Sequence, residues 1–251
     1  MVKILYFCYT MKVAQKIEKQ IKKLKAGTTF KYQQLFIELN EYSAATKAIE
    51  RLIDKGIIKR VSTGVFYKPK QTLFGELKPN EKELLKPYLF HNKKRIAYIT
   101  GISLYHRMGL TTQVPRNIKI ASRDKRITVS VGNIKGNPVK SYVDVTDENF
   151  TLLEISDALK DFKKIPDLDK DSGIKIISNQ LKELNIKEME KLIDCALSYP
   201  PRVRAFLGAL LEKMDVSIEL KTLKKSINPL SEYNYGIDKK ILSTMTNWNI
   251  K

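Results

Sequence analysis

The first 70 residues begin with hydrophobic positions in a helical pattern. From Val13 to Leu24 they recur every three or four residues with lysines between them, which predicts an amphipathic helix that ends at Gly27. Thr28 and Thr29 then supply candidate N-cap hydroxyls, and Tyr32–Leu39 is predicted as a second, short helix. The pattern therefore opens with two helices in close succession.

A third helix is predicted from Ser43, as its N-cap, to about Lys55, with Gly56 in the position that closes a helix. Its hydrophobic positions share one face. That inward face comprises Ala45, Ala48, Ile49, Leu52 and Ile53, and the outward face comprises Ala44, Thr46, Lys47, Glu50, Arg51 and Asp54.

A β-hairpin follows the third helix. Ile57–Val61 and Val65–Lys68 are predicted as strands joined by a turn at residues 62–64, and Pro69 ends the second strand. Three helices followed directly by a basic hairpin are typical of a winged helix-turn-helix. We assign that domain to residues 11–70.

The remaining residues mix both patterns, so the fold class expected for the chain is α+β. Residues 71–95 are predicted as a connector with a helix at 81–90, and residues 96–251 as a larger mixed α/β domain with a small sheet and several helices. The predicted strands are Asn117–Ala121, Ile127–Val131 and Val139–Val143. The predicted helices are Ser103–Met108, Leu152–Phe162, Ile174–Leu184, Lys187–Leu197 and Val203–Met214.

The excess of basic residues indicates what kind of ligand the chain binds. The chain has 46 Lys and Arg against 27 Asp and Glu, a net charge of +19. Residues 1–70 alone carry 15 basic and 5 acidic residues, a net charge of +10. A locally basic module favours a polyanion, and a winged helix suggests double-stranded DNA.

Other residue types restrict the location and the chemistry. Cys8 and Cys195 are far apart, and His91 and His106 lack the spacing of a zinc site, so we expect a reduced, cytoplasmic protein with no structural metal and no cofactor. Residues 1–10 are too short for a membrane span and lack the features of a signal peptide. We interpret them as an extension before a natural start at Met11, or as a loose strand.

The predicted DNA contacts lie at the start of the third helix, on the hairpin and before the second helix. A recognition helix presents its N-terminal residues to base edges, basic wing residues contact the backbone, and amides at a helix start hold phosphate. The helix set is Ser43, Ala44, Thr46, Lys47 and Arg51; the wing set is Lys59, Arg60, Ser62, Thr63 and Lys68; the phosphate set is Thr28, Thr29 and Lys31.

Enzymatic motifs are scarce, and we do not expect an enzyme. No P-loop, GxGxxG, GxSxG or HExxH occurs. Asp161 and Lys163 have the D-x-K spacing of metal-dependent nucleases, but on a predicted helix rather than a strand. A nuclease with a winged-helix targeting head therefore stays as an alternative, while the acidic positions from Asp144 to Asp157 are interpreted as a solvated face.

Three segments resemble one known family. The segments Ile49–Tyr67 (IERLIDKGIIKRVSTGVFY), Gly101–Pro115 (GISLYHRMGLTTQVP) and Pro200–Leu211 (PPRVRAFLGALL) are similar to parts of the AbiEi-type antitoxins of type IV toxin–antitoxin systems. The first resembles their N-terminal winged helix, and the other two are more distinctive. The first ten residues and the tail after Asp215 lie outside the resemblance.

The resemblance implies two activities. The N-terminal domain would bind inverted repeats in the promoter of its own operon and repress it, and the C-terminal domain would counteract a nucleotidyltransferase-type toxin, without implying a stable complex. A plain winged-helix transcription regulator with a ligand-sensing C-terminal domain is the remaining alternative.

Overall fold

The computed structural model describes residues 13–35, 37–73 and 75–251. The predicted N-terminal extension, its alternative as a loose strand and the start at Met11 lie outside these residues. The chain divides into two compact units: one runs to Asn92 and includes Ser130–Asn133, and the other comprises Lys93–Val129 and Ile134–Lys251. Helices and small sheets occur in both, so the fold class is α+β, as predicted.

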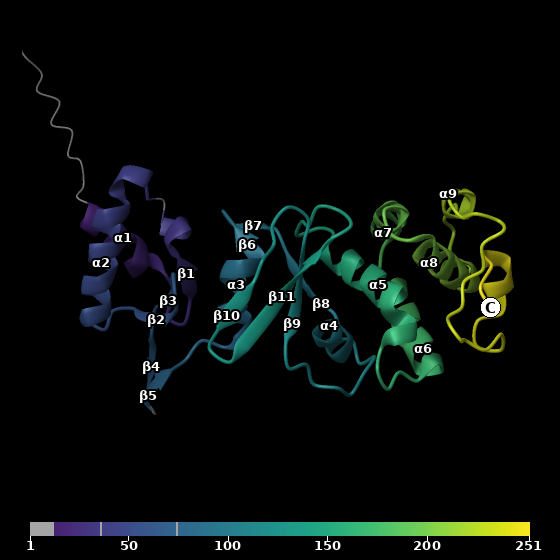
Figure 1. The fold of residues 1–251 in the computed structure, drawn as a ribbon, viewed down its shortest axis with the longest axis horizontal. Coiled ribbons are helices and arrows are strands. Elements are labelled where there is room, and N and C mark those ends of the chain that lie inside the picture. Colours follow the sequence, from purple (N-terminus) through teal and green to yellow (C-terminus); the bar gives the residue numbers. More distant parts are fainter. Residues whose placement is uncertain (1–12, 36, 74) are drawn as a thin grey trace, which may run out of the picture. The chain divides into compact units, whose positions relative to one another are not determined.

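The first unit has helices on a three-stranded antiparallel sheet with the order β1-β3-β2 (Figure 1). Helices α1 and α2 contact each other, and their buried faces close the core over the sheet. The elements are α1 (Val13–Lys23), β1 (Thr29–Lys31), η1 (Tyr32–Leu35), η2 (Leu39–Glu41), α2 (Tyr42–Asp54), β2 (Lys59–Ser62) and β3 (Val65–Tyr67).

Two predictions in this unit are wrong. The described residues between Tyr32 and Leu39 do not form an α-helix: the 3-10 helix η1 ends at Leu35, and the 3-10 helix η2 begins at Leu39. Thr29 does not cap a helix but begins β1, whose Phe30 pairs with Phe66 of β3. The sheet contact buries Phe30 in the core, which explains why a strand replaces the expected helix start.

The residues predicted as a connector contain regular structure that belongs mostly to the first unit. Strands β4 (Lys70–Thr72) and β5 (Gly75–Leu77) pair as a hairpin, and helix α3 (Glu81–Leu89) begins after the N-cap Asn80. Helix α3 contacts β1, and its residue Leu85 is buried. The short strands β6 (Phe90–His91) and β7 (Lys94–Arg95) follow.

The second unit contains three whole strands of a four-stranded sheet, with helices against it (Figure 1); Ser130 and Val131 of the fourth strand are assigned to the first unit. Its order is β10-β11-β9-β8, in which β11 and β9 are parallel and β8 and β9 are antiparallel. Helix α4 contacts β8 and β9, and α5 contacts β8. The strands are β8 (Tyr98–Thr100), β9 (Ile118–Ser122), β10 (Val129–Val131) and β11 (Ile134–Lys140).

A helical layer completes this unit, with α5, α7 and α8 in mutual contact. The helices are α4 (Ile102–Arg107), α5 (Phe150–Asp161), η3 (Phe162–Lys164), α6 (Lys170–Lys182), α7 (Ile186–Leu197), α8 (Pro201–Lys213), α9 (Lys221–Lys225) and η4 (Ser243–Trp248). The predicted strand Val139–Val143 is mostly wrong, because β11 ends at Lys140. The residues of α8 from Ala205 to Leu211 are all buried, so this helix is part of the hydrophobic core.

Candidate functional site

Helix α2 presents a basic face opposite its hydrophobic one. Ala45, Ala48, Ile49 and Leu52 are buried against the core of the first unit. The same helical period turns Ser43, Ala44, Lys47 and Arg51 to solvent. Among the residues that the structure describes, neither Lys47 nor Arg51 forms an ion pair, so both cations are available to a ligand. The predicted recognition face is therefore exposed as expected.

The start of α2 differs from the prediction. The helix begins at Tyr42, so Ser43 lies inside its first turn and is not the N-cap. Glu41, the last residue of η2, precedes the helix. Its carboxylate accepts a hydrogen bond from Lys16 Nζ on α1 at 3.2 Å, which connects α1 to the start of α2. Thr46 Oγ1 donates to the carbonyl oxygen of Tyr42 at 3.0 Å, so this hydroxyl proton is already committed.

The wing retains part of its predicted basic set. Lys59 of β2 forms an ion pair with Glu76 of β5 at 2.5 Å, which neutralises its charge locally. Arg60 is exposed, with its guanidinium carbon 5.7 Å from the ring centroid of Phe66. Thr63 is exposed in the turn, whereas Ser62 Oγ is buried without a hydrogen-bond partner in the described structure.

Lys68, predicted as a wing contact, has hydrogen-bond partners inside the protein. Its ammonium donates to three backbone carbonyl oxygens at the end of α1, those of Ile21 at 3.3 Å, Lys22 at 3.0 Å and Leu24 at 2.8 Å. Carbonyls at a helix C-terminus lack intrahelical partners and carry partial negative charge. Lys68 therefore caps α1 and joins it to the end of β3.

The groups of the predicted phosphate site at Thr28, Thr29 and Lys31 have partners within the unit. The amide of Thr28 donates to the Lys25 carbonyl at 3.2 Å, and that of Lys31 to Gln34 Oε1 at 2.9 Å. Thr29 is buried, and its hydroxyl donates to the carbonyl of Glu83. Lys31 lies with its ammonium 3.6 Å from the ring centroid of Tyr88. These groups stabilise β1 and α3 rather than forming an anion cradle.

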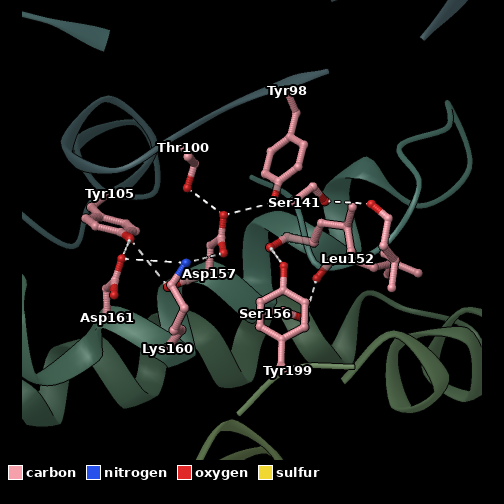
Figure 2. A network of polar contacts seen from close by, with 12 residues as sticks. Tyr98, Thr100, Tyr105, Ser141, Leu152, Ser156, Asp157, Lys160, Asp161 and Tyr199 are labelled. Atoms are coloured by element: carbon pink, nitrogen blue, oxygen red, sulfur yellow. Dashed lines mark hydrogen bonds and ion pairs between the residues drawn. The ribbon is translucent and has the colours of Figure 1, made fainter. Parts of the chain in front are cut away.

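The second unit contains a buried polar network that sequence reasoning missed (Figure 2). Asp157 on α5 is 2% exposed, although it was interpreted as part of a solvated face. Its Oδ2 accepts hydrogen bonds from Tyr98 Oη at 2.9 Å and from Thr100 Oγ1 at 2.6 Å, both on β8. Its Oδ1 forms an ion pair with Lys160 at 2.6 Å. The network thus joins the sheet to the helical layer.

Asp161, one turn further along α5, extends the network. Its Oδ2 accepts a hydrogen bond from Tyr105 Oη on α4 at 2.7 Å and lies 3.9 Å from Lys160 Nζ. Lys163, the other half of the D-x-K pair, donates to Asn234 Oδ1 at 3.2 Å instead of pointing to the same partners. Within residues 13–35, 37–73 and 75–251, no cluster of three or more His, Cys, Asp or Glu could hold a metal ion.

Burial controls the ionisation of this network. Burial raises the pKa of Tyr98, Tyr105 and Tyr199 well above the ordinary tyrosine range, and the neighbouring carboxylates of Asp157 and Asp161 raise those values further. Burial alone would lower the pKa of Lys160, but the Asp157 carboxylate reverses this effect and keeps that pKa above its usual value. The phenols therefore stay protonated as donors, and the lysine stays cationic.

Across the described residues, every helix is too short or too polar to serve as a membrane span. No curated protein matches the chain. Among solved structures, the crystal structure of the RV2827C protein from Mycobacterium tuberculosis is similar at 11% identity, with a TM-score of 0.46, over 89% of this chain and 85% of that one. Residues 16–191 match a family of unknown function, DUF6088. Because this match spans more than half of the chain, the protein belongs to the DUF6088 family.

Proposed function

We propose that the first unit binds double-stranded DNA as a winged helix, with α2 in the major groove and the β2–β3 turn on the neighbouring backbone. The observation that carries the proposal is the exposed face of α2, where Lys47 and Arg51 have no ion-pair partner among the described residues. Ser43 and Ala44 precede them and are small enough for close approach to base edges.

The contact set is narrower than the sequence predicted. Lys68 caps α1, and the groups at Thr28, Thr29 and Lys31 are committed within the unit. Lys59 is paired with Glu76. The proposed interface therefore consists of Ser43, Ala44, Lys47 and Arg51 on α2, supported by Arg60 and Thr63 on the wing.

A mobility-shift assay tests this interface on the DNA upstream of the protein's own gene. We expect a preference for that DNA over a random duplex, with affinity that falls steeply with salt, because lysine and arginine displace condensed counterions with a slope of about −0.9 for each phosphate neutralised. The double variant Lys47→Glu and Arg51→Glu should abolish the shift while the circular dichroism spectrum stays unchanged.

The matched control is the double variant Lys19→Glu and Lys23→Glu on the exposed face of α1, which changes the net charge equally. It should leave the sequence preference intact. If both variants lose binding to the same extent, or if the wild type shows no preference for its promoter, α2 is not the recognition helix.

We further propose that this binding represses the operon of an antitoxin, and that the second unit counteracts a nucleotidyltransferase-type toxin. The support is the resemblance of Gly101–Pro115 and Pro200–Leu211 to AbiEi-type antitoxins. Co-expression with the adjacent gene tests this half separately. Growth arrest by the neighbouring product alone, relieved by this protein, is expected; a harmless neighbour, or continued arrest, overturns it.

A further inference from the structure

A basic cavity lies in the second unit, at the carboxyl ends of its parallel strands. Strands β9 and β11 run side by side with Ser122 opposite Lys140, their last residues. A cavity of about 380 Å³ opens there, lined by residues 122–126 and 138–140. In sheets with parallel strands this edge is a frequent ligand position, because loops that leave adjacent strands together form its walls.

The side chains of the cavity are strongly cationic. Arg123, Lys125, Arg126 and Lys140 line it and are exposed, and Asp124 is the one acidic residue among its lining residues. A smaller adjoining hollow of about 90 Å³ shares residues 122–125 and adds Asp144. Among the described residues none of the four cations forms an ion pair, so the positive charge exceeds the negative even with both carboxylates included.

The base of the cavity is held in place by hydrogen bonds. Arg123 Nη1 donates to the carbonyl oxygens of Ser141 at 3.2 Å and Tyr142 at 2.9 Å. Ser122 Oγ donates to the Ile96 carbonyl at 2.8 Å, and the Ser141 amide donates to the Ser122 carbonyl at 3.0 Å. A guanidinium has five N–H donors, so Arg123 keeps donors for a ligand while its position is fixed. Such preorganisation reduces the entropy lost on binding.

We propose that this cavity is a phosphate-binding site. Four unpaired cations around one opening match a group that carries more than one negative charge and several acceptor oxygens, as a phosphate does. Its volume is near the lower end of small-ligand sites, which span roughly 300–1,000 Å³. The phosphate belongs either to a free nucleotide or to a nucleic-acid backbone. The site is separate from α2, so the proposal goes beyond the DNA-binding function of the first unit.

Backbone amide NMR on the full chain tests the site locally. The probes are inorganic phosphate, ATP without metal and a short random-sequence DNA duplex, each compared with sodium chloride at equal ionic strength. We expect saturable shifts at residues 122–126 and 138–140. A response to ATP but not to the duplex identifies a nucleotide site, and a response to the duplex identifies a backbone contact. No response to any probe beyond the salt control overturns the proposal.

The variant Lys125→Gln, Arg126→Gln and Lys140→Gln should weaken the responding probe roughly tenfold or more, because charge-assisted hydrogen bonds are lost. The control Lys187→Gln, Lys221→Gln and Lys239→Gln removes the same charge from exposed positions of the same unit and should bind as the wild type does. Equal weakening by both variants contradicts a specific site. The Lys47→Glu and Arg51→Glu variant should keep the response, which separates this proposal from the function of α2.

Discussion

The carboxylate of Asp157 lies in a hydrophobic interior and is stabilised there by two hydroxyl donors and one ammonium. A charged group in such surroundings is tolerated only when its acceptor sites are filled, because desolvation costs several kcal/mol for each ion. Tyr98, Thr100 and Lys160 fill them from two elements. Each of these residues therefore depends on the others for a favourable environment.

Replacing Asp157 with Asn should lower the free energy of unfolding by about 3 kcal/mol, because the ammonium of Lys160 loses its main counter-ion in a largely buried position. Urea unfolding followed by circular dichroism measures the loss. Asp161→Asn is the control, since the side chain of Asp161 is 31% exposed and the Asp157–Lys160 pair survives. That variant should lose clearly less. Equal losses would mean that the pair is no more important than its neighbour.

Helix α8 and η4 approach each other closely at one position. Gly208 on α8 faces the indole of Trp248, and a Cβ atom built at position 208 would lie 2.2 Å from Trp248 Cζ3. Trp248 Nε1 donates a hydrogen bond to Glu212 on the same helix, which fixes the ring over the glycine. The absence of a side chain at one position thus lets the C-terminal segment lie against the helical layer.

Gly208→Ala should destabilise the protein by about 1 to 3 kcal/mol through overpacking. The sign is informative, because alanine is the better helix former by about 1 kcal/mol and would otherwise stabilise α8. Thermal unfolding measures the change. The chain has one tryptophan, so displacement of Trp248 can be followed by its fluorescence emission. Gly208→Ala combined with Trp248→Leu should recover part of the loss; an unchanged or raised midpoint in the single variant would contradict the close approach.

At the scale of the whole molecule, buried phenols link stability to alkaline pH. Burial and, to a lesser extent, the neighbouring Glu76 raise the pKa of Tyr67 to about 12. Burial also raises the pKa of four further phenols above the ordinary value of 10.0; these are Tyr98, Tyr105, Tyr199 and Tyr235. The folded state holds these protons more tightly than the unfolded state does, so their contribution to stability is complete below pH 10 and is lost as the pH rises.

We therefore expect the free energy of unfolding to fall progressively above about pH 10. The tyrosinate absorbance of the buried phenols should rise together with cooperative unfolding. The raised pKa of Lys160 acts in the same direction. Tyr235→Phe removes one of the linked protons and should make the decline shallower. Constant stability between about pH 9 and 11.5 would contradict the linkage.

The spacing of hydrophobic residues predicted correctly which side chains of a helix are buried and which are exposed. The faces of α2 follow from its 3.6-residue repeat, so the burial of Ala45 and Ile49 and the exposure of Lys47 and Arg51 were correctly predicted. Strand β1 was missed because it has three residues, and its pairing with β3 is set by residues far along the chain.

The chemistry of single side chains was harder to predict. The sequence around Asp157 is typical of an exposed helix acid, but its hydrogen-bond donor Tyr98 lies 59 positions earlier in the chain. Lys68 lies in a segment typical of a basic wing, but its three carbonyl acceptors are at the end of α1. The type of a charged residue shows which groups could pair with it, but the tertiary structure determines which of them does.

The cap formed by Lys68 also places a thermodynamic constraint on the first unit. Its ammonium acts as an internal counter-charge for α1, so any phosphate that captured it would leave three helix carbonyls without their donor. Binding at that lysine and fraying of the last turn of α1 would then be reciprocally coupled. Acetylation of Lys68 would have the same consequence without any ligand, because a neutral amide cannot replace the lost charge. The stability of the last turn of α1 therefore depends on whether Lys68, just after β3, is bound by a ligand or modified.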